Sequence, residues 1–213
     1  MKMIKPLSGC LVVVLGAAAL SLAQQNTGQS PSNAPAISPE LQKLRQQREA
    51  TSQPGPRHLS LMRLDGDYVT KEKYYPPGQS TPLESDGTAT LRSEMGGRFI
   101  VERNAGGYLG EPYIGLRIYG FNNGTKKYEG VWTSSKSTAV ISLLGDSKDG
   151  GMTIEYTGTY HEDTTGSMRT MQITLHILDP DHFEVQVIRT MPDGSPGPKL
   201  VSLYTRKFLP LGS

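Results

Sequence analysis

The sequence predicts an all-β protein: an antiparallel up-and-down β-barrel of about ten strands, with a short N-terminal helix capping one end. Three observations support this fold class. Apolar and polar residues alternate from about residue 66 to the end of the chain, turn signals such as Asp86-Gly87 recur at regular intervals, and no helical pattern separates the strands. Closing such a meander into a barrel pairs its two edge strands.

The first 23 residues have the pattern of a secretory signal peptide. Lys2 and Lys5 precede an apolar run from Leu11 to Leu22, and Ala23 offers a small residue for cleavage. The run is too short to span a bilayer, and no second apolar run of membrane length follows it. We therefore expect an exported protein, periplasmic or extracellular, whose mature chain has no transmembrane segment.

Cys10 is the single cysteine of the chain, and it lies in a lipoprotein-like "LSGC" box. The box precedes the apolar run instead of following it, which argues against lipidation of Cys10. Cleavage after Ala23 removes this thiol, which excludes disulfides, cysteine nucleophiles and cysteine-ligated metals from the mature chain. Cleavage also removes two lysines, so the formal net charge falls from +2 to zero and indicates no nucleic-acid partner.

Residues 24–56 have the composition of a flexible tether, rich in Gln, Ser, Pro and Ala. One helix is predicted within it, over residues 39–50, with Ser38 as N-cap and Pro39 in the first helical position. Its apolar face holds only Leu41 and Leu44. The barrel domain then occupies residues 57–213.

The barrel domain opens with "HLSLMRLDGDY", residues 58–68, which predicts a short helix, a turn at Asp65-Gly66 and the start of the first strand. The apolar side chains are expected to plug one end of the barrel; they are Leu59, Leu61, Met62, Leu64 and Tyr68. His58 lies one helical turn before Leu61, at the edge of the plug. We expect a neutral, structural histidine, hydrogen-bonded to the backbone or to Asp65, with a ligand role as the alternative.

Ten strands are predicted between the turn signals. They span residues 66–75, 86–94, 98–104, 113–121, 126–134, 137–145, 152–160, 168–178, 182–190 and 199–207. Gly96-Gly97, Gly106-Gly107 and Asp179-Pro180-Asp181 are among the expected turns.

Several segments in this order resemble one family. They are "HLSLMRLDGDY", "GGRFIVE", "IYGFNNGTKKYEGVWTSS", "DGGMTIEYTGTY", "DPDHFEV" and "MPDGSPGPKLVSLYTRK". The chain resembles the bacterial domain of unknown function 1579, and this resemblance implies a lipocalin-like (calycin-type) β-barrel. Where this family usually has Trp in the opening segment, the chain has Tyr68. The resemblance implies a fold and no settled catalytic residue.

A barrel that binds a fatty acid or similar amphiphile needs apolar walls and a few polar donors for the head group. The residues predicted to line such a cavity are Tyr128, Trp132, Tyr156, Tyr160, Phe183, Val185, Val187, Arg189, Tyr204 and Arg206. The "YTR" of Tyr204 and Arg206 is similar, in reverse order, to the Arg and Tyr pairs of cytoplasmic fatty-acid carriers. The alternatives are that the arginines lie on the rim in water and that Tyr128 and Trp132 pack as core.

No catalytic, metal or cofactor site is predicted. His161, His176 and His182 share strand faces with polar neighbours, so none is expected to face the apolar interior. The acidic segments "GDSKDGG" and "HEDTTG" lack the spacing of a calcium loop and fit turns. No Ser-His-Asp order and no pair of interior carboxylates emerges.

We therefore expect a non-catalytic binder of a small apolar or amphipathic molecule. Two alternatives stay open: an envelope interaction or scaffold protein with a filled barrel, and an enzyme on a calycin barrel. The interior discriminates between them, because two or more titratable groups in a cavity would favour an enzyme and an empty apolar cavity would favour a binder.

Overall fold

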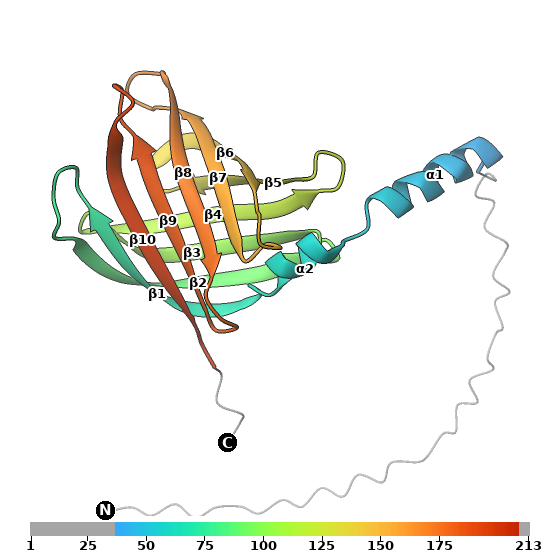
Figure 1. The fold of residues 1–213 in the computed structure, drawn as a ribbon, viewed down its shortest axis with the longest axis horizontal. Helices are drawn as coiled ribbons and strands as arrows, with labels where there is room; N and C mark the ends of the chain where they lie inside the picture. The colour runs from blue at the N-terminus through green and yellow to red at the C-terminus, as the bar shows by residue number, and fades with distance from the viewer. Residues whose placement is uncertain (1–36, 209–213) are drawn as a thin grey trace, which may run out of the picture. The chain divides into compact units, whose positions relative to one another are not determined.

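The computed structural model describes residues 37–208, so the predicted signal peptide, Cys10 and the first part of the tether lie outside it. The chain has two helices followed by ten strands (Figure 1). They are α1 (Pro39–Thr51), α2 (Pro56–Met62), β1 (Gly66–Tyr75), β2 (Leu83–Glu94), β3 (Phe99–Tyr108), β4 (Glu111–Asn122), β5 (Lys127–Ser134), β6 (Ser137–Asp146), β7 (Thr153–His161), β8 (Met168–Ile177), β9 (His182–Thr190) and β10 (Pro196–Arg206).

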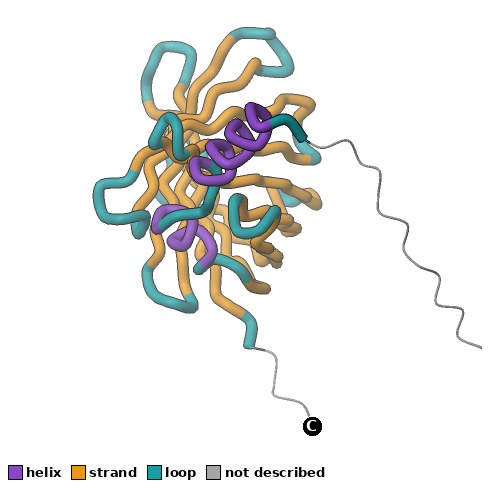
Figure 2. Tube along the Cα trace, turned by 90° about the vertical axis from the view of Figure 1, so that its right-hand side faces the viewer, coloured by secondary structure: helices purple, strands orange, loops and turns teal. Residues whose placement is uncertain are grey.

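The ten strands form one closed, antiparallel, up-and-down barrel, which confirms the predicted fold class. Each strand pairs with the next along the chain, and β1 closes the barrel by pairing with β10 from Tyr68↔Arg206 to Tyr75↔Lys199. Both helices precede β1, so only loops join consecutive strands, as Figure 2 shows. No helix within residues 37–208 is both long and apolar enough to cross a bilayer.

All ten predicted strands are present, and the largest difference lies at the end of β3. Gly106-Gly107, predicted as a turn, continues β3 and pairs with Tyr113 and Pro112 of β4. The chain reverses instead at Leu109-Gly110, where both residues have positive φ angles, of 53° and 80°. The small size of Gly107 serves packing, since a Cβ there would lie 3.2 Å from the Cβ of Ser85 on β2.

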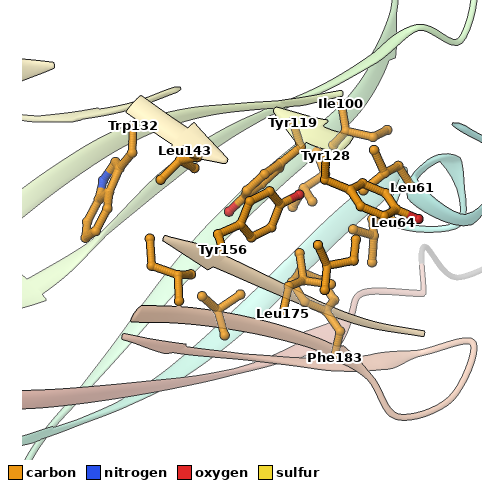
Figure 3. Close-up of a cluster of buried hydrophobic side chains, with 14 of the residues drawn as sticks. Leu61, Leu64, Ile100, Tyr119, Tyr128, Trp132, Leu143, Tyr156, Leu175 and Phe183 are labelled. Atoms are coloured by element: carbon orange, nitrogen blue, oxygen red, sulfur yellow. The ribbon is translucent and has the colours of Figure 1, made fainter. Parts of the chain in front are cut away.

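Alternate strand residues point inward and fill most of the barrel. The core includes five tyrosines that are almost completely buried: Tyr68, Tyr119, Tyr128, Tyr156 and Tyr204. In Figure 3, Tyr119, Tyr128 and Tyr156 lie between Trp132 on one side and Leu61 and Leu64 on the other. The interior therefore runs from an apolar region beside α2 to an aromatic region around Trp132.

Helix α2 covers one end of the barrel, where it contacts β3 and β4 (Figure 1). Leu61 and Leu64 are buried in the core, and the Tyr68 hydroxyl donates a hydrogen bond to the Leu64 carbonyl at 3.0 Å. Met62 is half-buried. The prediction that Leu59 belongs to the plug is wrong: its side chain is 56% exposed, because the short helix presents only one face to the barrel.

His58 is a buried residue of α2. Its Nδ1 accepts a hydrogen bond from the Gly55 backbone N–H at 3.0 Å, and its ring meets Phe121 edge-on at 5.7 Å. Burial lowers the pKa of this imidazole, which favours the neutral form that accepts the hydrogen bond. The alternative partner Asp65 instead accepts a hydrogen bond from the Ser93 backbone N–H at 2.7 Å.

Helix α1 begins at Pro39, as predicted, and extends one residue beyond the predicted end at residue 50. None of its residues is buried. The link to the barrel is made at the end of the helix and just after it: Asn123 Nδ2 donates to the carbonyls of Thr51 and Gln53 at 3.0 and 2.9 Å.

Candidate ligand site at the open end of the barrel

A small cavity opens at the end of the barrel opposite α2. It encloses about 50 Å³. Its wall comes from the far ends of β1, β3, β5 and β9 and from the first residues of β4 and β10, and it includes Glu72, Asn104, Tyr113, Arg117, Trp132 and Leu200. The antiparallel topology explains this gathering, because successive strands present alternate termini to the same end.

A buried ion pair lies at the inner side of the cavity. Arg117 Nη1 donates to Glu102 Oε1 at 2.8 Å, and the two side chains are 4% and 0% exposed. Burial by itself lowers the pKa of Arg117, but the Glu102 carboxylate raises it, and the pKa lies well above its ordinary value. Arg117 is therefore a permanent cation inside the barrel.

Two tyrosine hydroxyls complete this ion pair. Tyr204 OH donates to Glu102 Oε1 at 2.7 Å and accepts from Arg117 Nη1 at 3.0 Å. Tyr119 OH donates to Glu102 Oε2 at 3.3 Å. Burial, followed by the charge of Glu102, raises the pKa of both phenols, so both stay protonated and act as donors. These hydrogen bonds satisfy both oxygens of Glu102.

Aromatic side chains form the outer part of the wall. The Arg117 guanidinium lies 4.6 Å from the centre of the Trp132 ring, and Trp132 Nε1 donates to Tyr113 OH at 3.1 Å. Tyr113 in turn lies 6.3 Å from Tyr108, which meets Tyr74 edge-on at 5.5 Å. The indole and three phenols thus form a continuous aromatic surface leading from solvent to the buried arginine.

Two further polar side chains in the wall lack hydrogen-bond partners. Glu72 is buried, and the charges that act on its carboxyl group are those of Arg117 and Glu102, without a hydrogen bond from any described residue. Asn104 is also buried, and its Oδ1 has no hydrogen-bond partner within residues 37–208. Buried polar groups are normally hydrogen-bonded. The Glu72 carboxyl group and Asn104 Oδ1 are therefore available to bind a small molecule.

Gly115 makes room for this arrangement on β4. A Cβ at this position would overlap Asn104 Oδ1 and would lie 2.6 Å from Tyr113 OH. Any residue larger than glycine would therefore push Asn104 or Tyr113 out of the cavity wall.

The structure divides the predicted lining residues between the cavity and the core. Trp132, Val187 and Arg189 line the cavity. Further into the barrel, Tyr128, Tyr156, Phe183, Val185 and Tyr204 are buried core, while Tyr160 is half-buried and packs against it. Val187 is buried in the cavity wall, whereas Arg189 is exposed and lies at the rim of the opening.

The predicted pairing of Tyr204 with Arg206 at a head group is wrong. Arg206 ends β10 beside α2, where it donates to the carbonyls of Arg63 and Asp65 and lies 5.0 Å from the Tyr68 ring. Residues two apart on a strand point to the same side but lie at different depths along the barrel. The arginine that Tyr204 contacts is Arg117 on β4.

Sequence reasoning missed the polar residues of the interior: Glu72, Glu102, Asn104 and Arg117. A signal existed in β4, where Tyr113, Gly115, Arg117 and Tyr119 alternate with Ile114 and Leu116. Both faces of this strand contain apolar residues, so the pattern does not show which face points into the barrel. Charged residues such as Arg117 are normally assigned to the solvent face.

The remaining histidines and acidic turns take no part in the cavity. His161 and His176 are exposed, and His182 pairs with Asp179 at 2.9 Å on the surface. Asp149 accepts hydrogen bonds from the Thr153 backbone N–H and the Ser147 hydroxyl, as a turn residue does. In the part of the chain that the structure describes, no three His, Cys, Asp or Glu side chains gather as metal ligands.

Comparison with solved structures finds one protein of similar fold and a second, weaker match. An S-type phycobiliprotein lyase, CPES, from Guillardia theta aligns with a TM-score of 0.50 and 9% sequence identity, over 76% of this chain and 98% of the lyase. A redesigned β-barrel aligns with a TM-score of 0.36 and 15% identity, over 68% of this chain and 93% of that chain. No curated protein matches the sequence.

The similarity to the lyase is one of fold alone at this level of identity. The family comparison is more specific, because a single family model covers the whole of α2 and all ten strands. The match runs over residues 53–206. The chain therefore belongs to the DUF1579 family, which is described as a protein of unknown function.

Proposed function

We propose that the barrel binds a small amphipathic molecule at its open end and does not transform it. The observation that carries this proposal is the cavity wall, in which an aromatic surface leads to buried polar groups that lack partners. Ligand sites in proteins combine these two features, an apolar lining and a few polar groups that fix orientation.

The size of the cavity limits how such a molecule would bind. About 50 Å³ is far below the roughly 300 Å³ at which drug-sized pockets begin. It suffices for a head group and the first atoms of a chain. The apolar remainder of the ligand would lie along Tyr74, Tyr108 and Trp132, toward solvent.

A filled-barrel interaction protein is the second candidate, and the packed interior supports it. Most inward side chains contact one another, including the five buried tyrosines. This candidate predicts no saturable binding of small amphiphiles, which separates it from the first.

Catalysis has weaker support. The cavity contains titratable groups, which by themselves would favour an enzyme, but Arg117 is occupied by Glu102. Among the described residues that line the cavity, Glu72 carries the single carboxyl group. General acid–base catalysis usually pairs such a group with a second acid, base or nucleophile. The phycobiliprotein lyase of similar fold does not decide the matter, since one fold serves many functions.

Trp132 provides a direct test, because it is the single tryptophan of the chain and lies in the cavity wall. The protein would be titrated with decylamine, decanol and decanoate while Trp132 fluorescence is recorded. A saturable change with at least one compound supports binding, and the absence of a change with all three contradicts it.

Two variants on β10 locate the response. Leu200→Phe enlarges a side chain of the cavity wall and should abolish or weaken the titration. Leu203→Phe makes the same change on the outer face, between the buried Ser202 and Tyr204, and should leave the titration unchanged. Equal effects of the two variants would exclude the cavity as the site.

We also propose that the protein acts after export, which the signal-like pattern of residues 1–23 supports. Intact mass of the protein isolated from its own cells would test this. A chain that begins at Gln24 is expected, and a chain that retains residues 1–23 would contradict export by this signal.

A further inference from the structure

The cavity offers hydrogen-bond acceptors whose donors are missing. Glu72 is 8% exposed and Asn104 is 6% exposed, yet neither the Glu72 carboxyl group nor Asn104 Oδ1 has a hydrogen bond from residues 37–208. An unpaired buried polar atom normally destabilises a fold by the lost hydration. Asn104 Oδ1 is such an atom, and beside it the Glu72 carboxyl group has no hydrogen bond from these residues, which indicates a site that a ligand completes.

Several donors in the wall are already used elsewhere. Both described hydrogen bonds of Arg117 leave from Nη1, to Glu102 and Tyr204. Trp132 Nε1 donates to Tyr113, and Lys136 Nζ at the rim pairs with Glu111 at 2.6 Å. Since no described residue donates a hydrogen bond to Glu72 in this arrangement, a bound molecule or water can supply that donor.

The charges of the cavity also leave Glu72 without a counter-charge. Glu102 and Arg117 neutralise each other at 2.8 Å. Burial raises the pKa of Glu72, an effect that Arg117 opposes and Glu102 reinforces, so the empty site disfavours the carboxylate. A cation at this point would stabilise the carboxylate, and the surrounding phenol and indole rings are suited to a cation as well.

Resting on the proposed function, we infer that the ligand presents a protonated amine to the cavity, held by Glu72 and Asn104 with its apolar part against the aromatic wall. The ligand class is thus an amphipathic organic cation. Apolar carboxylic acids, which the arginines at first suggest, are disfavoured because the buried arginine already holds Glu102.

The ten-carbon series separates this inference from the proposed function. For the unmodified protein, decylamine should bind at least about tenfold more tightly than decanol or decanoate, the effect of one charge-assisted hydrogen bond. Decanoate binding as tightly as decylamine, or more tightly, overturns the amine assignment while leaving ligand binding intact. No response to any of the three compounds defeats the proposed function itself.

Two variants test the residues. Glu72→Gln should reduce decylamine affinity about tenfold and leave decanol affinity unchanged. The same exchange at the exposed Glu155 of β7 should alter neither. An unchanged ratio of decylamine to decanol affinity in Glu72→Gln would overturn the assignment.

Asn104→Leu provides a second readout that a purely structural residue would not give. Removal of the unpaired amide should raise the urea midpoint of unfolding and at the same time weaken decylamine binding. If the variant gains stability and binds decylamine as tightly as the unmodified protein, Asn104 does not contact the ligand.

Discussion

Arg117→Met tests the buried ion pair. Methionine retains much of the volume of the arginine stem but removes the charge and the donor to Glu102 and Tyr204. Since Glu102 is 0% exposed, its charge would remain inside the barrel without a cation. Breaking a buried pair in this way costs about 3–5 kcal/mol, which is a large part of a typical stability of roughly 5–15 kcal/mol.

The assay is urea unfolding followed by far-ultraviolet circular dichroism, with Arg92→Met as the matched control. Arg92 pairs with Asp67 at 2.7 Å, but the two side chains are 41% and 40% exposed. We expect the control to lose less than about 1 kcal/mol of unfolding free energy. The difference between the two variants measures the effect of burial on otherwise similar ion pairs.

The double variant Glu102→Gln/Arg117→Met completes the test. Glutamine keeps one oxygen that can accept from Tyr204, and its amide N–H can donate to the Tyr119 hydroxyl, while the charge is removed. Its unfolding free energy should lie within about 1–2 kcal/mol of the unmodified protein. Burial does not set the effect of the ion pair if Arg117→Met is no more destabilising than Arg92→Met, or if the double variant is as unstable as Arg117→Met alone.

Three further predictions concern single residues. Because burial raises the pKa of Glu72 in the folded state, its contribution to stability is present at low pH and is lost as pH rises through that raised value. Glu72→Gln should therefore gain on the order of 1 kcal/mol relative to the unmodified protein between pH 4 and pH 8, and parallel pH profiles would contradict this. Gly115→Ala should lose about 1–3 kcal/mol in urea unfolding and weaken decylamine binding, because its Cβ overlaps Asn104. Arg206→Ala should lose about 2 kcal/mol because it removes the hydrogen bonds to the Arg63 and Asp65 carbonyls that follow α2, and decylamine affinity in the Trp132 titration should stay unchanged; weakened binding would argue against separate roles for the two barrel ends.

The sequence predicted the fold well because strand and turn signals are local. Period-two alternation and Gly- or Asp-containing turns place each of the ten strands within a few residues of its position in the structure. The exception at Gly106-Gly107 shows the limit. A glycine pair reads as a turn, but here it serves the close approach of β2 to β3, which only the folded barrel reveals.

The site could be predicted only in part, because it depends on which face of each strand points inward. Trp132, Val187 and Arg189 were found through their apolar neighbours on the same face. Glu72, Glu102 and Arg117 were missed because a lone charged residue normally indicates a solvent face. The burial of Glu102 and Arg117 becomes possible only when β3 and β4 pair and the two charges meet.

The indole N–H of Trp132 offers the most direct measurement of the central claim, that the open end of the barrel binds an amphipathic cation. The chain has one tryptophan, so a ¹H–¹⁵N spectrum contains one indole resonance, and this N–H donates to Tyr113 in the cavity wall. Titration with decylamine should shift this resonance to a saturable limit, with much smaller shifts for Leu61 and Leu64 at the α2 end. A stationary indole resonance, or equal shifts at both ends of the barrel, would contradict the account.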